Sequence, residues 1–412
     1  MRAFVVAHTH PPEPAVFSSD VADEFVRRGH DVTVFAPFPN RPGGKIYEGY
    51  HRRWRSVTRE GGCRVVRSWH TLSGRSTMLS RFAENISFGL TSTVQLIVHL
   101  LGRPRVNVAF LRTWSLFARN LNSLVLRLWG VPVVSCALDV YPESLVERGT
   151  LKPDGIVARV MLGLDRLHLR QCSAILTLTP GMAELLVATR GLQGSRVNHL
   201  PVYADAGPFA QAVSPLAFRS RHDIPVSVFL AMFVGSLTQS AGLNLYIEVA
   251  DALRSEDGIV ILLVGDGPSR ADLERDISDR KLSNIVVVHP LKPSDVPEVQ
   301  AAADVLLLSL AGRMSLSATP SKQAFYMLSG KPIVASVPAE NHSATILRES
   351  QSGFVLPPGD PVAVAQVLRS VKHRPQSLRQ MGENARRYAL REFSRDAVIP
   401  RLVGIVGSAA RI

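Results

Sequence analysis

Short apolar runs alternate along the chain with longer segments in which apolar positions recur every three or four residues. The short runs, rich in Val, Ile and Leu, are typical of buried strands, and the longer segments are typical of amphipathic helices. The predicted strands are 3–7, 31–36, 64–68, 106–111, 131–137, 174–179, 228–234, 259–264, 285–288, 305–310, 333–336 and 353–356. The predicted helices include 16–28, 243–254, 269–280, 295–302 and 361–370. This alternation predicts parallel sheets with helices on both faces.

The alternation is interrupted once, which predicts two domains. The segment 200–225 is rich in Pro, Ala and Ser and has no clear period, and the run VFLAMFVGS at 228–236 begins a new strand. A chain of 412 residues is long enough for two or three domains of about 150 residues each. We therefore predict an α/β protein of two doubly wound domains. Ligands of such sheets bind at the carboxyl ends of the strands, so a cleft between the domains is the expected site.

The chain is strongly basic, with a formal net charge of +13, which favours anionic partners. No helix-turn-helix, zinc-finger or aromatic single-strand-binding pattern is present in the sequence, so no nucleic-acid partner is expected. The three cysteines have no paired spacing, which indicates a reducing, cytoplasmic compartment. The N-terminal run reads as a strand rather than a signal peptide, and no apolar run approaches the about 18 residues of a membrane span.

Two segments leave a choice between a structural and a membrane-binding interpretation. Segment 79–101, LSRFAENISFGLTSTVQLIVHLL, is long and apolar, and its length favours a buried core helix. The alternative is a surface that touches lipid, supported by Arg81, Arg103 and Arg105. The basic patch 51–55, HRRWR, favours a solvated loop, with an anionic membrane surface as the alternative.

Three loops that follow strands of the second half together form a candidate phosphate site. The first contains Gly235 and Ser236, the second is the turn with Gly265 and Asp266, and the third contains Ser321 and Lys322. A glycine lets the backbone approach a ligand closely, while a helix N-terminus, a hydroxyl and an ammonium group can bind phosphate oxygens. Each loop alone also fits an ordinary turn or a capped helix, but three on one sheet edge together predict a phosphate site. The sequence has no Walker A, His-Glu-x-x-His or Asp-x-Asp pattern and no Gly-x-Gly-x-x-Gly after the first strand, so helix ends and Lys or Arg would neutralise the phosphate charge, with no metal.

A series of short motifs runs in a fixed order through most of the chain. They are RGHDVTV at 28–34, FPN at 38–40, GKIYEGY at 44–50, LDVYPESL at 138–145, VGDGP at 264–268, AD at 303–304, PSK at 320–322 and SGKP at 329–332. In this order and spacing they resemble the retaining GT-B glycosyltransferases of family 4, in the bacterial branch that builds O-antigen, capsule and exopolysaccharide. The resemblance implies transfer of a sugar from a nucleotide donor to a glycan acceptor, such as a sugar on a polyprenyl diphosphate, at the cytoplasmic face of the membrane and without a cofactor.

The resemblance also implies a domain arrangement and a set of site residues. Two Rossmann-like domains would face a central cleft, with acceptor binding in 1–205, donor binding in 206–385, and the helical segment 386–412 returning to the first domain. Catalytic roles are implied for Asp139 and, in the loop after the first strand, for His10 or His8. The donor diphosphate would be held by Gly235, Ser236, Ser321 and Lys322. The remaining donor pocket would be formed by Gly265, Asp266, His289, Leu291 and Phe325, and the acceptor side by Asn40, Tyr141 and Glu143.

Three departures from the family pattern concern the donor. The loop 8–15, HTHPPEPA, lacks the family's Gly-Gly, and the loop 238–241, TQSA, lacks its lysine. Phe325 stands where the family usually has a glutamate that binds the ribose, and Ser317 at the position of that glutamate's partner. A phenyl ring accepts no hydrogen bond, and losing such a charged contact costs about 1.5–3 kcal/mol. A degenerate, non-catalytic GT-B module that partners another transferase or binds a ligand therefore remains an alternative. A GT-B sugar-nucleotide epimerase is a distant third, because its paired carboxylates and His cannot be assembled here.

Overall fold

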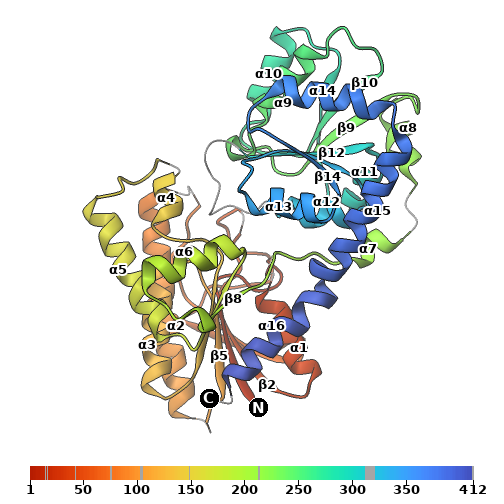
Figure 1. The fold of residues 1–412 in the computed structure, drawn as a ribbon. Helices are drawn as coiled ribbons and strands as arrows, with labels where there is room; N and C mark the ends of the chain where they lie inside the picture. The colour runs from red at the N-terminus through yellow and green to blue at the C-terminus, as the bar shows by residue number, and fades with distance from the viewer. Residues whose placement is uncertain are drawn as a thin grey trace. The chain divides into compact units, whose positions relative to one another are not determined.

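The computed structural model describes residues 1–13, 15, 17–41, 43–74, 77–102, 105–147, 149–211, 214–310 and 321–410. It divides into two compact units, each built around its own sheet (Figure 1). The first unit comprises Met1–Leu200 together with the chain from Ile399 onward, and the second comprises Pro201–Val398.

The first unit contains an eight-stranded sheet in the order β3-β4-β2-β1-β5-β6-β7-β8. Its strands are β1 (Arg2–Ala7), β2 (Asp31–Pro37), β3 (Arg55–Glu60), β4 (Cys63–Ser68), β5 (Val108–Arg112), β6 (Val133–Ala137), β7 (Ala174–Thr177) and β8 (Val197–His199). All neighbouring strands are parallel except β3, which pairs antiparallel with β4. The central strands are buried on both faces, as parallel sheets covered by helices require.

Helices cover both faces of this sheet. They are α1 (Ser18–Arg27), α2 (Met78–Leu101), α3 (Leu116–Leu128), α4 (Glu143–Glu147), α5 (Ile156–Gln171), α6 (Pro180–Arg190), η1 (Gly194–Arg196) and α16 (Arg395–Ala409), which begins in the second unit. Helix α2 packs on α3, and α3 packs on α5, so these three form one continuous layer (Figure 1).

The second unit contains a fully parallel six-stranded sheet in the order β11-β10-β9-β12-β13-β14. Its strands are β9 (Phe229–Val234), β10 (Ile259–Val264), β11 (Ile285–Val288), β12 (Val305–Ser309), β13 (Ile333–Ser336) and β14 (Gly353–Leu356). Its helices are α7 (Gly207–Ala210), α8 (Pro215–Arg221), η2 (Gln239–Ala241), α9 (Asn244–Ala252), α10 (Arg270–Asp279), η3 (Pro293–Asp295), α11 (Val296–Ala302), α12 (Lys322–Leu328), α13 (His342–Glu349), α14 (Pro361–Lys372) and α15 (Pro375–Glu392). Both faces of β9 are buried, with Phe233 in one apolar cluster and Met232 in the other.

The predicted α/β class with two doubly wound parallel sheets is confirmed, and each predicted strand is present with shifts of only a residue or two at its ends. Two strands were not predicted. Strand β3 is an edge strand with mostly exposed side chains and no apolar run, and β8 has three residues. The segment 200–225, predicted without regular structure, contains the short helices α7 and α8.

The interpretation of 79–101 as a buried core helix is wrong in one respect. The segment is helical, but Leu79, Phe82 and Leu90 are exposed, whereas Glu84 and Gln95 are buried. In the described part of the chain, no helix is both long and apolar enough to cross a bilayer.

Candidate functional site

The loops after β9 and β10 interlock through their backbones. The N–H of Leu237 donates to the carbonyl of Asp266 at 2.9 Å. Gly265 has a φ of +145°, and a Cβ there would stand 2.0 Å from the carbonyl oxygen of Gly235. Only glycine allows the two loops to approach this closely. The packing of the two loops therefore requires the first glycine of the Gly-Asp-Gly-Pro turn, whether or not the turn contacts a ligand.

The side chain of Lys322 lies across the end of β9. A Cβ at Gly235 would stand 2.6 Å from Cε of Lys322, so the glycine makes room for the lysine. The ammonium lies 5.0 Å from the centre of the Phe233 ring. Burial lowers the pKa of Lys322, and among the described residues no carboxylate pairs with it. Lys322 is thus a half-buried cation that has no carboxylate partner among the described residues.

Helix α12 is held against β9 by a residue that the sequence analysis did not select. The hydroxyl of Tyr326 accepts a hydrogen bond from the N–H of Val234 at 2.8 Å and donates to the carbonyl of Val234 at 3.0 Å. Tyr326 stands four residues after Lys322, on the same face of the helix. It therefore fixes the helix turn that carries Ser321 and Lys322. Because α12 has only seven residues, Lys322 rather than the helix end supplies most of the positive charge.

These elements surround a pocket of about 540 Å³ in the second unit. Its walls include eight of the predicted donor residues, namely Gly235, Ser236, Gly265, Asp266, Leu291, Ser321, Lys322 and Phe325. Predicted residue His289 is not part of the lining, because its ring lies against Arg270, at 2.6 Å, and 3.5 Å from Glu274. A volume of this size is within the range of small-molecule sites.

The position predicted to meet the ribose is apolar in the structure as well. Phe325 is partly exposed and packs edge-on against Phe209, with ring centres 6.3 Å apart. Its expected partner position, Ser317, lies outside the described residues. Two other polar groups line the same pocket, Asp205 and Gln300. Gln300 is buried, and its Oε1 has no hydrogen-bond partner among the described residues.

Sequence reasoning missed Asp205 and Gln300 because neither belongs to a motif. Asp205 lies in the segment without a period, and Gln300 lies on α11, far from the phosphate loops in sequence. Their only sequence signal is a polar residue next to, or within, an otherwise apolar segment. The structure brings both to the pocket wall that also holds Phe325.

In the first unit, Asp139 and Tyr141 line a smaller cavity of about 200 Å³ together with Thr113, Trp114 and Arg119. Asp139 follows the carboxyl end of β6, and the Tyr141 hydroxyl donates to its Oδ2 at 3.3 Å. The family resemblance implied a catalytic role for Asp139 and an acceptor-side position for Tyr141, and in the structure these two side chains are in contact.

A buried ion network holds the loop that carries Asp139. Arg190, fully buried, binds both carboxylate oxygens of Glu143 and donates from Nε to Oδ2 of Asp165 at 2.8 Å. Arg119 pairs with the other oxygen of Asp165. Burial acts to raise the pKa of Glu143, but the hydrogen bond and charge of Arg190, a backbone hydrogen bond and the charge of Arg166 together outweigh it, so this pKa is lowered. Glu143, predicted on the acceptor side, is thus a paired carboxylate that positions the loop.

The two histidines after β1 lie in different surroundings. The ring of His8 is 4.0 Å from that of Trp114, and its Nδ1 is 3.2 Å from the hydroxyl of Thr113, so His8 contacts two residues of the Asp139 cavity. His10 instead lies 4.0 Å from a carboxylate oxygen of Glu60. Burial lowers the pKa of His10 to about 4 and that of His8 well below its usual value. Both are therefore neutral at pH 7, and His8 is the one near Asp139.

Predicted residue Asn40 is buried in a polar cluster with Glu13 and His70. The backbone N–H groups of Asn40 and Arg41 both donate to Oε1 of Glu13 at 2.7 Å. Nδ2 of Asn40 lies 3.0 Å from Nε2 of His70. The second oxygen of Glu13 has no hydrogen-bond partner among the described residues. Asn40 thus joins the loop after β2 to the loop after β4, and Glu13 was not predicted.

Comparison with solved structures identifies the fold. The structure of Anabaena HepE in complex with UDP and glucose superposes on this chain with a TM-score of 0.71. The match covers 99% of this chain and 100% of HepE, at 16% sequence identity. This likeness shows the fold, which is GT-B.

Family and sequence comparisons then identify the kind of enzyme. Residues 14–203 match the glycosyl transferase 4-like domain, and residues 229–373 match glycosyl transferases group 1. WcaI of Escherichia coli K12, a glycosyl transferase named for colanic acid biosynthesis, is 23% identical over 69% of this chain and 70% of its own. The 2-deoxystreptamine glucosyltransferase of Streptomyces kanamyceticus is 31% identical over 54% of this chain and 56% of its own. The chain is a GT-B glycosyltransferase that resembles family 4.

Proposed function

We propose that this glycosyltransferase binds a nucleoside-diphosphate sugar in the pocket of the second unit and transfers the sugar to a glycan acceptor with retention and without a metal. The observation that carries the proposal is Lys322. A half-buried ammonium with no carboxylate partner among the described residues is unfavourable in the free protein. A diphosphate in the pocket would supply that counter-charge, next to the backbone at Gly235 and the hydroxyls of Ser236 and Ser321.

The chemistry that these residues support is stabilisation of the departing diphosphate. Negative charge grows on the leaving group as the bond to the sugar breaks, and a fixed ammonium in a partly dry pocket stabilises it more than water does. If the acceptor hydroxyl attacks from the face of the leaving group, no protein nucleophile is required. Asp139 and Tyr141 would orient that hydroxyl, a contribution of position rather than of covalent catalysis. Retention itself rests on the family resemblance.

The donor ribose would be bound differently from the family pattern. Phe325 cannot accept a hydrogen bond, so another acceptor in the pocket would bind the ribose hydroxyls. Asp205 lines the same pocket, and among the described residues its carboxylate forms no ion pair. One of its oxygens accepts from the N–H of Gly207 at 2.9 Å, which fixes the side chain. We assign the ribose contact to Asp205.

The acceptor would be a growing cell-surface polysaccharide, carried on a polyprenyl diphosphate at the cytoplasmic face of the membrane. The name of WcaI, colanic acid biosynthesis, supports a polysaccharide acceptor. The formal net charge of +13 supports work next to anionic lipid.

The test is calorimetric titration of the purified protein with UDP, GDP, dTDP and ADP, first without metal and then with magnesium. Binding of one nucleotide without metal would support the proposal and name the donor base. Binding only with magnesium would contradict the metal-independent part. If none of them binds in either condition, the degenerate-module alternative replaces the transferase proposal.

A further inference from the structure

Helix α2 carries large apolar side chains on its exposed face as well as on its buried face. Its exposed face carries a stripe of large apolar residues at helical spacing from the first turn to the last, namely Leu79, Phe82, Leu90, Val94, Val98 and Leu101. Its buried face combines the apolar residues Phe88, Leu96 and Leu100 with five polar ones, namely Glu84, Thr91, Ser92, Gln95 and His99. A surface helix of a globular protein turns its apolar stripe inward. The outward stripe of α2 therefore indicates an apolar partner outside the unit.

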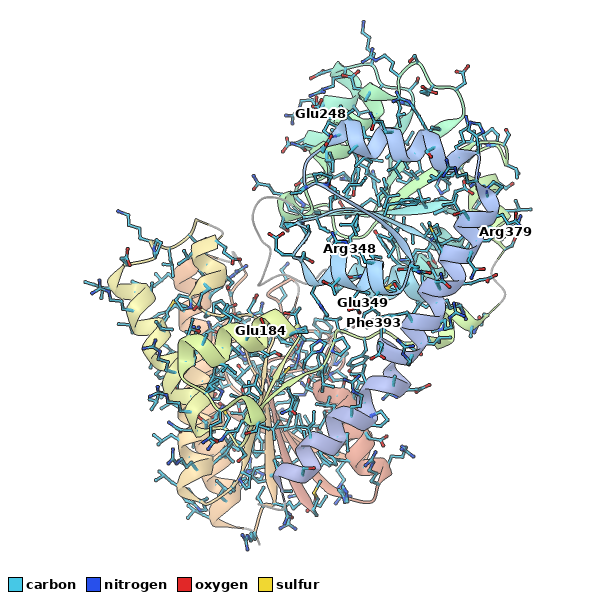
Figure 2. The ribbon with its side chains drawn as sticks, viewed as in Figure 1. Glu184, Glu248, Arg348, Glu349, Arg379 and Phe393 are labelled. Atoms are coloured by element: carbon cyan, nitrogen blue, oxygen red, sulfur yellow. The ribbon has the colours of Figure 1, made fainter. Side chains whose placement is uncertain are left out.

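The neighbouring helices extend this surface. Leu124 and Leu128 of α3 and Ile156, Val160 and Leu167 of α5 are also exposed. We call the exposed side of α2, α3 and α5 the three-helix face; side chains project outward along α3 and α5 (Figure 2). More than half of the large hydrophobic side chains exposed among the described residues lie on these three helices. Exposed apolar area that gathers on one surface marks an interaction site.

The charges of the three-helix face have one sign. Its helices contain two carboxylates, Glu84 and Asp165, and both are buried and paired with arginines. The exposed charged side chains are arginines, namely Arg81, Arg127, Arg159, Arg166 and Arg170. Exposed carboxylates occur outside the face, at Asp154 before α5 and at Glu184 on α6. Glu184 is labelled in Figure 2. The partner therefore combines an apolar interior with a negatively charged surface.

We propose that the three-helix face docks on a bilayer that contains anionic lipid. Helix α2 has 24 residues and a length of about 36 Å, and it would lie in the plane of the interface with its apolar stripe among the acyl chains. The arginines would contact lipid phosphates. A second copy of this chain fits less well, because a symmetric pairing would bring the arginines of one copy against those of the other.

This inference concerns a surface of the first unit that is separate from the donor pocket of the second, and it does not depend on the transfer reaction. Nucleotide binding by the purified protein in solution should be the same whether or not the face is altered. Membrane binding and donor binding can therefore be lost independently in the experiment.

The experiment is co-sedimentation of the full-length protein with vesicles of phosphatidylcholine alone, or with about one third phosphatidylglycerol. We expect binding to the anionic vesicles that weakens at about 1 M salt, where the Debye length falls to about 3 Å. The double variant Phe82→Glu/Val94→Glu should bind at least about tenfold more weakly, because it removes two apolar anchors and adds two negative charges. Each of Arg81→Gln, Arg127→Gln and Arg159→Gln should weaken binding about fivefold.

The matched control is Val226→Glu/Val362→Glu, which places the same two carboxylates at exposed apolar positions of the second unit. The control should bind vesicles like the unaltered protein, and all variants should keep the unaltered affinity for nucleotide. Equal binding of the Phe82→Glu/Val94→Glu variant and the unaltered protein would overturn the proposal, as would equal binding to neutral and anionic vesicles. A dimer in light scattering that this variant dissociates, without vesicle binding, would assign the face to a second copy and overturn the lipid assignment.

Discussion

Replacing Lys322 by methionine tests two expected effects of its positive charge. The charge should strengthen the binding of a nucleoside diphosphate, and it should destabilise the free protein. The methionine side chain is unbranched and of similar length, so it keeps the packing against Gly235 and the contact with the Phe233 ring. Only the charge is lost. A hydrogen bond from a charged group is worth about 1.5–3 kcal/mol, and each 1.4 kcal/mol is a factor of ten in affinity. We therefore expect Lys322→Met to weaken nucleoside-diphosphate binding about 10- to 150-fold.

The same substitution should not lower the stability of the free protein. Burial lowers the pKa of Lys322, so the unfolded chain binds this proton more tightly than the folded one. The charged lysine thus destabilises the fold at neutral pH, and this effect fades as pH rises toward the ordinary lysine pKa. In Lys322→Met, unfolding in urea should occur at the same or a higher urea concentration, and the rise in stability with pH from this group should vanish.

Calorimetry and urea unfolding measure both effects, and Lys331→Met is the matched control. Burial also lowers the pKa of Lys331, but Lys331 does not line the pocket, so its removal should leave nucleotide affinity unchanged. The reasoning would be refuted by a Lys322→Met affinity within twofold of the unaltered protein, or by an equal loss in both variants.

Three further predictions follow from single observations. Gly265→Ala would place a Cβ 2.0 Å from the Gly235 carbonyl oxygen, so we expect loss of nucleotide binding and a lower midpoint of thermal unfolding by circular dichroism; unaltered values would contradict the interlocked loops. Asp205→Asn should weaken binding of a ribonucleoside diphosphate about tenfold but leave a 2′,3′-dideoxy analogue unaffected; an equal effect on both would exclude the ribose assignment. Burial lowers the pKa of His10 and His70 to about 4, so the unfolded state binds more protons than the folded state between pH 6.5 and 4. The first unit should therefore lose stability on acidification through this window, by up to about 3 kcal/mol for each histidine. All four tryptophans lie in the first unit, so tryptophan fluorescence during urea unfolding measures this loss, and a midpoint independent of pH over that window would disprove it.

The central strands of both sheets could be predicted because they are buried on two faces. Strand β10 begins and ends where its apolar run does, since every position of such a strand needs an apolar side chain. Strand β3 lacks this requirement at the sheet edge and was missed. The helical period of α2 was also visible, but the period does not tell which side faces the protein. That choice depends on the partners of Glu84 and Gln95, which only the fold supplies.

The phosphate loops could be located from the sequence, but the contacts that each of their residues makes could not be predicted from it. Gly265 was selected for a ligand, and the structure gives it a close contact with the backbone of Gly235. Glu143 was selected for the acceptor, and the structure pairs it with Arg190, 47 residues away in sequence. Asp205 and Gln300 come from separate elements that meet only in the folded unit. Long-range pairing of this kind leaves no local pattern.

Lys322 and Phe325 lie on the same short helix and point to opposite conclusions about the donor site. A half-buried cation that destabilises the free protein is useful only when a ligand neutralises it, so Lys322 favours a diphosphate. Phe325 removes the usual ribose acceptor and, with Phe209, makes that wall apolar. The two observations agree if phosphate recognition is retained and ribose recognition has moved to Asp205. We therefore infer that the donor diphosphate is recognised through α12, and the donor ribose through Asp205.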